Sequence, residues 1–139
     1  MAGQLRKYEA AADDPEGQSH VAEHLPSCFD EEDRVLIREG HRSWFVPVRE
    51  IELLEAQGNH SRVYFGEERP LLYRPLQTLE NRLPSRLFFR ASRSHLINLR
   101  AIVGIRDGDN GQYRVTLRGG QEIQISRRQA RAFREKTSL

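Results

Sequence analysis

Short stretches of alternating apolar and polar residues, separated by turn signals, make up most of the chain after residue 33. Residues 112–118 show the alternation clearly, because Tyr113, Val115 and Leu117 are interleaved with two arginines and a threonine. Successive side chains of a strand point to opposite faces, so this segment is predicted to have one buried and one basic face. The same pattern predicts strands over 34–38, 44–48, 51–57, 62–65, 69–73, 87–91, 94–97, 101–106, 112–118 and 121–125.

Turn residues join these predicted strands. Asp109-Asn110-Gly111 and Gly119-Gly120 are strong hairpin signals, because both sites tolerate a positive φ angle. A further turn is predicted over Gly58-Asn59-His60-Ser61, between two apolar segments. Tight turns between short strands indicate mostly antiparallel pairing.

After residue 33, two segments carry the spacing of a helix, and residues 4–12 could form one or two further helical turns. Pro75 suits the first helical position, and three leucines within residues 76–83 are spaced to form one buried face. The second helix is predicted at about 127–136, where Ser126 is the N-cap and Gln129 completes a capping box. The expected fold is therefore mainly β, with short strands and two short helices.

Composition separates the chain into two regions. Residues 1–33 contain nine acidic and two basic residues and few large apolar ones, which predicts an acidic linker or flexible tail. Residues 34–139 are predicted to form the folded domain. Cys28 is the only cysteine, which excludes an internal disulfide. His20 and His24 have helical i,i+4 spacing but lack a third ligand nearby, so we expect no metal site.

Charge is distributed unevenly along the sequence. Residues 82–139 carry 13 Lys and Arg against 4 Asp and Glu, whereas residues 1–81 carry 9 against 16. All but two of the 22 basic residues are arginine, whose planar fork grips phosphate and guanine edges at two points. A basic C-terminal half of this kind indicates nucleic acid or another polyanion as the partner.

Two basic segments are candidates for contact with an anion. Residues 90–94 form a turn with two arginines and two serines between apolar strands. Arg127 and Arg128 follow Ser126 at a helix N-terminus, which is a favourable seat for phosphate. Each segment has a structural alternative: Arg90 bracing its own turn, and a solvated basic helix start.

Other polar and aromatic residues have a structural interpretation. Asn98 is expected to fix a turn, and His95 is expected to pack between its apolar neighbours. Trp44, Phe88 and Phe89 are expected in the core, so no exposed aromatic surface for single strands or RNA is predicted. No Walker A, GxGxxG, HExxH or GxSxG motif is present, so we expect neither catalysis nor a cofactor.

From about residue 34 onward the sequence resembles a LytTR-type DNA-binding domain, the output half of bacterial two-component response regulators. The matching segments, in order, are Val48–Glu55 with Asn59-His60, Pro75–Glu80, Phe88–Asn98, Ile102–Ile105 and Ile125–Arg128. The resemblance implies an elongated β-sandwich that docks on double-stranded DNA through loops. It implies base contacts by His60, Arg93 and Arg127, and phosphate or register contacts by Asn59, Arg90, Ser92, Ser126 and Arg128.

The expected function is sequence-specific binding of promoter DNA by a transcriptional regulator. The resemblance also implies repeated half-sites, a homodimer on DNA and a receiver domain or sensor kinase, although this sequence carries no receiver. Since neither a membrane span nor a signal peptide is evident, we expect a cytoplasmic protein with no membrane partner. Two alternatives stay open: a non-catalytic β module that binds an acidic protein, and an acidic tail that covers the basic face.

Overall fold

The computed structural model describes Tyr8 and residues 28–139, whose strands form three antiparallel sheets. The first is a hairpin of β1 (Arg34–Glu39) and β2 (Arg42–Pro47). The second runs in the order β5 (Leu71–Leu72), β4 (His60–Tyr64), β3 (Leu53–Gln57), β7 (His95–Asn98) and β6 (Phe88–Ser92). The third has β10 (Glu122–Ile125), β9 (Tyr113–Leu117) and β8 (Ile102–Asp107).

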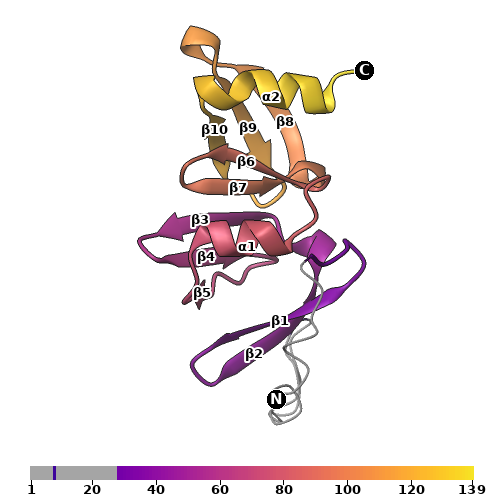
Figure 1. The fold of residues 1–139 in the computed structure, drawn as a ribbon, viewed down its shortest axis with the longest axis vertical. Helices are drawn as coiled ribbons and strands as arrows, with labels where there is room; N and C mark the ends of the chain where they lie inside the picture. The colour runs from indigo at the N-terminus through magenta and orange to yellow at the C-terminus, as the bar shows by residue number, and fades with distance from the viewer. Residues whose placement is uncertain (1–7, 9–27) are drawn as a thin grey trace.

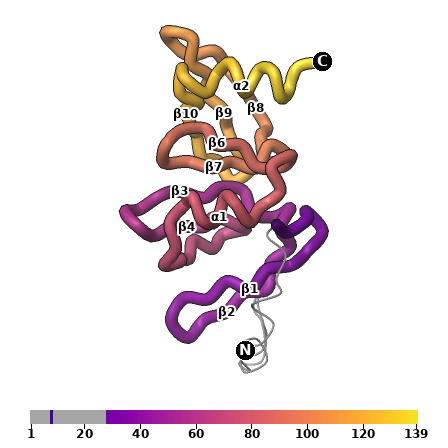
Figure 2. Tube along the Cα trace, viewed as in Figure 1, coloured from indigo at the N-terminus to yellow at the C-terminus, as the bar shows by residue number. Residues whose placement is uncertain are grey.

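The three sheets follow one another along the long axis of the molecule (Figure 1), and the chain traces them from the hairpin to the C-terminus (Figure 2). Helix α1 (Leu76–Arg82) lies beside the five-stranded middle sheet, and α2 (Arg127–Thr137) covers the three-stranded sheet at the far end. This arrangement confirms the expected elongated, mainly β architecture with two helices. No helix in the described part of the chain is long and apolar enough to cross a bilayer.

The middle sheet is buried on both faces, and this explains the sandwich. Leu53 and Leu54 are neighbours in β3 and both are buried, as are Leu96 and Ile97 in β7. Because consecutive strand residues face opposite ways, each pair supplies two cores. Leu54 and Leu96 join the core beneath the β1–β2 hairpin and α1, whereas Leu53 and Ile97 join the core beneath the three-stranded sheet and α2.

The predicted local signals are confirmed at the turns and at the second helix. Asn110 has a φ of 58° and Gly120 a φ of 97°, so both predicted hairpins use the positive φ that their sequences permit. Ser126 caps α2, since its Oγ accepts a hydrogen bond from the backbone N–H of Gln129 at 3.2 Å. The predicted capping box is incomplete, because the backbone N–H of Ser126 donates to the carbonyl of Ala91 and not to the Gln129 side chain. Trp44 is 1% exposed and lies in the core as expected.

Some predicted boundaries were wrong. The strand expected over 69–73 is reduced to β5, Leu71–Leu72, and the strand expected from residue 51 begins at Leu53. The turn expected over residues 58–61 is tighter, and His60 already opens β4 opposite Gln57. A positive φ of 66° at Gly58 allows the chain to reverse within this shorter turn.

The prediction of a tail over residues 1–33 falls mostly outside the described residues, as does the His20–His24 pair. Where the structure describes this region, it lies against the domain. The backbone N–H of Phe29 donates to the carbonyl of Arg82 at 2.8 Å, and the Arg82 guanidinium lies 5.0 Å from the Phe29 ring centre. Tyr8 packs edge-on against Phe65, and burial with a bond to the Glu50 carboxylate raises the pKa of Tyr8 to about 12.

Candidate nucleic-acid interface

Two of the predicted contact segments are adjacent turns at one end of the middle sheet. Strand β3 pairs with β4 so that Gln57 lies opposite His60, and it pairs with β7 so that Glu55 lies opposite His95. The backbone N–H of Ala56 also donates to the carbonyl of Ser94 at 2.8 Å. The β3–β4 and β6–β7 turns therefore project from the same end of the sheet (Figure 1).

The third segment, the start of α2, is bonded to this end of the sheet. The backbone N–H of Ser126 donates to the carbonyl of Ala91 in β6 at 3.0 Å, and Phe133 of α2 packs against Phe89 with ring centres 5.5 Å apart. These contacts fix the helix N-terminus beside the β6–β7 turn. All three segments that the sequence singled out thus lie along one side of the molecule.

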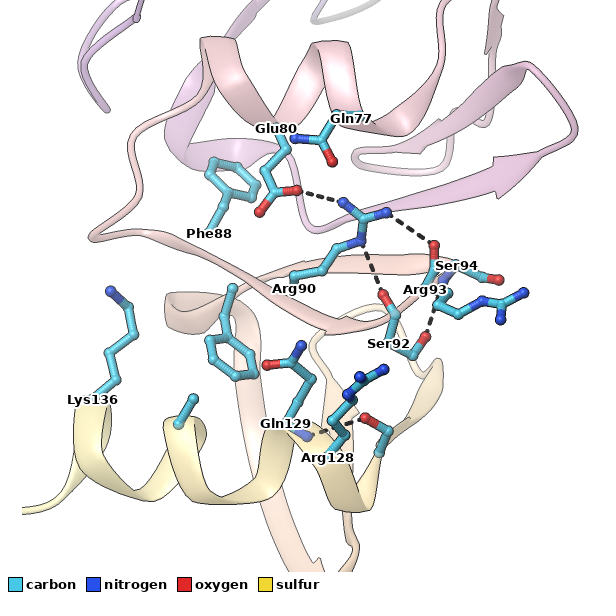
Figure 3. A pocket seen from close by; sticks show the side chains of 13 residues that line it. Gln77, Glu80, Phe88, Arg90, Ser92, Arg93, Ser94, Arg128, Gln129 and Lys136 are labelled. Atoms are coloured by element: carbon cyan, nitrogen blue, oxygen red, sulfur yellow. Dashed lines mark hydrogen bonds and ion pairs between the residues drawn. The ribbon is translucent and has the colours of Figure 1, made fainter.

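A groove of about 850 Å³ lies between α1, the β6–β7 turn and α2 (Figure 3). Its apolar part includes Phe88 and Phe89, and its polar part includes Glu80 on α1. The predicted site residues that line it are Arg90, Ser92, Arg93, Ser126 and Arg128. His60, Asn59 and Arg127 do not line this groove.

Among the described residues, the three most exposed predicted arginines make no ion pair. Arg93, Arg127 and Arg128 are all exposed. Arg128 lines the groove that Arg93 shares, whereas Arg127 extends toward the β8–β9 turn, where a Cβ added at Gly111 would lie 4.0 Å from its Cγ. This end of the molecule therefore presents three cationic forks to solvent.

Arg90 has a different environment, since each of its nitrogens is bonded within the protein. Its Nε donates to the carbonyl of Ser92 at 2.9 Å, and its Nη2 donates to the carbonyl of Arg93 at 3.0 Å. Its Nη1 bonds the carboxylate of Glu80 on α1 (Figure 3). Arg90 thus makes the bonds to nearby carbonyls that the structural alternative expects.

The β6–β7 turn needs such bracing because of its sequence. Arg93 and Ser94 form a two-residue turn, and neither residue has a positive φ. Two-residue hairpins favour turn types with positive φ, because these match the twist of the strands. Side chains stabilise the turn instead: besides the bonds of Arg90, the Oγ of Ser92 accepts from the backbone N–H of Ser94 at 3.2 Å.

His95 was expected to pack within the protein rather than to contact DNA, and the structure places it half-buried with polar neighbours. Its Nδ1 forms a hydrogen bond of 3.1 Å with the Oγ of Ser92, and its Nε2 lies 3.4 Å from Oε2 of Glu55. Tyr64 donates to the other oxygen of Glu55 at 2.8 Å, and burial together with this bond raises the pKa of Tyr64. The signal in the sequence was the turn itself, which lacks glycine, asparagine and aspartate and so depends on polar neighbours.

The remaining predicted residues are placed as follows. Asn59 is exposed at the tip of the β3–β4 turn, and the His60 ring lies 4.6 Å from the ring centre of exposed Tyr73. Nδ1 of His60 is buried and has no hydrogen-bond partner in the part of the chain that the structure describes. Asn98 has the expected structural role, because its side chain bonds the backbone of Arg49, Ile51 and Arg100.

No group of three or more His, Cys, Asp or Glu side chains within the described residues could hold a metal ion. The chemistry that this end of the molecule offers is therefore hydrogen bonding and cation–anion contact. Arginine forks, a capped helix start and serine hydroxyls are the donors that proteins use for phosphates and base edges.

Comparison with known proteins identifies the family of this domain. The family model of the LytTr DNA-binding domain matches residues 41–138. The sensory transduction protein LytT of Enterococcus faecalis is 26% identical over 98 residues, which are 70% of this chain and 40% of that protein. The transcriptional regulatory protein BtsR of Escherichia coli K12 is 39% identical over 64 residues, which are 46% of this chain and 26% of that protein.

A solved structure shares the fold. It is a LytTr DNA-binding domain of a response regulator from Bacillus cereus, and it superposes with a TM-score of 0.70 at 23% identity, covering 77% of this chain and 98% of that one. The chain spans less than half the length of the curated relatives it matches. The match of the family model over most of the chain, together with this fold, shows that the chain belongs to the LytTR family of DNA-binding domains.

Proposed function

We propose that this chain binds double-stranded promoter DNA in a sequence-specific manner, as the output domain of a bacterial transcriptional regulator. The observation that carries the proposal is that Arg93, Arg127 and Arg128 are exposed along one side of a domain of this family and, within the described part of the chain, make no ion pair. Other arginines near the interface are engaged in the protein, as Arg90 is with Glu80. Because these arginines are exposed and repel one another only weakly in water, an approaching anion can bind them without displacing an internal partner among the described residues.

In the proposed complex, Arg93 and Arg127 donate to base edges, and His60 adds a contact from the neighbouring turn. The two donors of an arginine fork match O6 and N7 of guanine. Arg128 joins them as a candidate base contact, because it lines the groove that Arg93 shares. Asn59, Ser92 and the capped start of α2 at Ser126 would bond phosphates and set the register.

The role assigned to Arg90 follows from its contacts. Its three bonds, to Ser92, Arg93 and Glu80, leave it occupied in holding the turn. We therefore propose that Arg90 sets the register indirectly, by fixing the position from which Arg93 reaches DNA. Arg90 would thus contribute by holding the contact turn in its binding conformation before DNA arrives. A turn that is already ordered loses less conformational entropy on binding.

The context of the domain is also a proposal. The relatives are named as a sensory transduction protein and a transcriptional regulatory protein, and the chain matches 40% and 26% of their lengths. We propose that a receiver domain or a sensor kinase controls this domain, in the cytoplasm. Occupancy of repeated half-sites by two copies would double the contact surface without requiring an interface between the proteins in solution.

The test is selection of bound sequences from a pool of random duplexes, followed by anisotropy titration of the enriched duplex. The affinity should fall with salt, with a slope of log K of about −0.9 for each phosphate neutralised. Arg93→Ala and Arg127→Ala should each lose roughly 1–3 kcal/mol on the enriched duplex and much less on random DNA. Arg131→Ala is the matched control, because Arg131 is exposed on α2 and paired with Glu135.

Each outcome has a defined meaning. Equal losses on the enriched and random duplexes would make a residue a phosphate contact. Arg128→Ala is tested in the same way, and a loss confined to the enriched duplex assigns it to base reading. Binding that depends neither on duplex nor on sequence would contradict the proposal and favour an acidic protein as the partner.

A further inference from the structure

We propose that His95 is a positioning residue for the DNA-contact turn, and that a proton taken up by its ring turns the Ser92 hydroxyl toward a DNA phosphate. This inference rests on the proposed function. His95 itself lies behind the turn, at the first position of β7 and opposite Ser92 in the register. It acts on DNA through Ser92, a residue of the groove that Arg93 and Arg128 line.

The imidazole has polar groups from two different strands beside its nitrogens, one in a hydrogen bond and one at ion-pair distance. Nδ1 lies 3.1 Å from the Oγ of Ser92 in β6, and Nε2 lies 3.4 Å from Oε2 of Glu55 in β3. Tyr64 of β4 fixes the Glu55 carboxylate by donating to its other oxygen at 2.8 Å. The ring therefore cannot turn without losing contacts at both of its nitrogens.

The proton arrangement of the neutral ring restricts Ser92. In the proposed neutral state, the single proton lies on Nε2, the nitrogen nearest the Glu55 carboxylate, and Nδ1 is an acceptor. The Ser92 hydroxyl then donates its only proton to Nδ1, while its oxygen accepts from the backbone N–H of Ser94 at 3.2 Å. In this state Ser92 has no proton to offer a phosphate, because phosphate oxygens only accept.

Uptake of one proton from solution reverses the bond between the two side chains. Nδ1–H then donates to the Ser92 oxygen, and the hydroxyl proton is released to point toward solvent. The ring also becomes a cation whose charge is balanced by Glu55. Both changes favour an anion at the turn: the hydroxyl gains a free donor and the surface gains a positive charge.

The surrounding charges divide into two groups. The Glu55 carboxylate is at ion-pair distance from the ring, DNA phosphates would add negative charge, and the neighbouring arginines add positive charge. Among the described residues, the titratable and charged groups of β3, β4, β6 and the β6–β7 turn are Glu55, His60, Arg62, Tyr64, Arg90 and Arg93, with Arg69 over the Tyr64 ring and Arg128 in the groove. Since imidazole changes its charge near neutral pH, arrival of DNA can shift this balance under ordinary conditions.

The first experiment measures affinity for the enriched duplex from pH 5.5 to 8.5 at constant ionic strength. Wild-type protein should bind more tightly at the acidic end, by roughly tenfold if the ring binds its proton about tenfold more tightly in the complex than in the free protein. His95→Gln should show a nearly flat profile, because glutamine keeps hydrogen-bonding groups but does not titrate. Ser92→Ala should show a smaller gain than wild type, because only the charge of the ring is left to act.

Two further histidines provide controls. His41→Gln, at an exposed site in the β1–β2 turn, should follow the wild-type profile. His60→Gln lies in the proposed interface and should weaken binding while keeping the ratio between the two ends of the pH range. A ratio that is lost in His60→Gln and kept in His95→Gln would overturn the inference. Thermal unfolding at both ends of the range checks that each variant is folded.

A second measurement does not depend on any variant. Nitrogen chemical shifts of the His95 ring near pH 7 should report the Nε2–H tautomer in the free protein and a doubly protonated ring once the enriched duplex is added. A ring that stays neutral on bound DNA would overturn the inference while leaving the proposed function intact. If no duplex is enriched at all, the proposed function itself fails.

Discussion

At the scale of single residues, the β6–β7 turn shows how side chains replace an unfavourable backbone. Arg93 and Ser94 reverse the chain without a positive φ, and Arg90 compensates with bonds to the carbonyls of Ser92 and Arg93. The guanidinium can make these bonds and reach Glu80 at the same time because it carries five donors in a fixed plane. The partly buried guanidinium therefore connects the contact turn to α1.

Arg90→Lys tests this bracing. A lysine has a single nitrogen and cannot bond two carbonyls and a carboxylate in the same geometry, so Arg93 should become less well positioned. We expect a three- to tenfold loss of affinity for the enriched duplex, on the order of 1 kcal/mol, and a change of unfolding free energy below about 1 kcal/mol. Arg86→Lys, at an exposed site before β6, is the matched control.

Equal affinity of Arg90→Lys and wild type, measured by anisotropy in the same salt, would contradict the bracing role. A loss that is equally large on random DNA would instead make Arg90 a phosphate contact, as the resemblance implied. The ratio of affinities for the enriched and random duplexes therefore distinguishes a bracing role of Arg90 from a phosphate contact.

At the scale of elements, the signals that predicted the fold are local ones. The cap of α2 needs Ser126 and Gln129, three residues apart, and the β9–β10 hairpin needs Gly120 at its own turn. Contacts between strands of the sheet could not be predicted from such local signals. The pairing of Glu55 with His95 depends on the register of two strands 40 residues apart, which tertiary packing sets and no adjacent residue encodes.

The same limit applies to the candidate site. Arg93, Arg127 and Arg128 could be singled out from sequence because turn chemistry and helix capping place them locally. The contact of Glu80 with Arg90 could not, since it depends on where α1 lies against β6. Phe29 was also missed, because a single aromatic residue before an acidic run does not show which surface will bury it.

Helix α2 depends on Phe133 for its position. This side chain is 3% exposed and contacts the rings of Phe89 in β6 and Tyr113 in β9. Phe133→Ala should lower the unfolding free energy by roughly 3–5 kcal/mol, through lost burial and the cavity left behind. Urea denaturation measures this loss, and Phe133→Leu should recover much of it.

Comparison of Phe133→Ala with Ser126→Ala distinguishes the packing of α2 on the sheet from the formation of the helix itself. Ser126→Ala removes the cap and should cost about 1 kcal/mol, without moving the helix away from Phe89. Unchanged stability and unchanged affinity for the enriched duplex in Phe133→Ala would contradict the view that packing of α2 on the sheet positions Arg127 and Arg128.

At the scale of the whole molecule, residues 28–33 form part of the folded unit. The backbone N–H groups of Val48 and Arg49 donate to the carbonyls of Asp33 and Glu31, at 2.8 and 3.1 Å. Phe29 packs against the core beneath the β1–β2 hairpin and α1. The boundary drawn from composition, between residues 33 and 34, would cut through these contacts, whereas one before residue 28 would spare them.

Two truncations test this boundary and the role of the acidic segment together. A chain of residues 34–139 should have an unfolding free energy roughly 2–4 kcal/mol lower than that of residues 28–139, as measured by urea denaturation. The shorter chain exposes the Phe29 site and leaves the buried Val48 without its hydrogen-bond partner. Equal stability would place residues 28–33 outside the folded unit. In 28–139, affinity for the enriched duplex above that of the full chain would mean that the acidic residues before 28 cover the basic end, and an unchanged affinity would contradict that alternative.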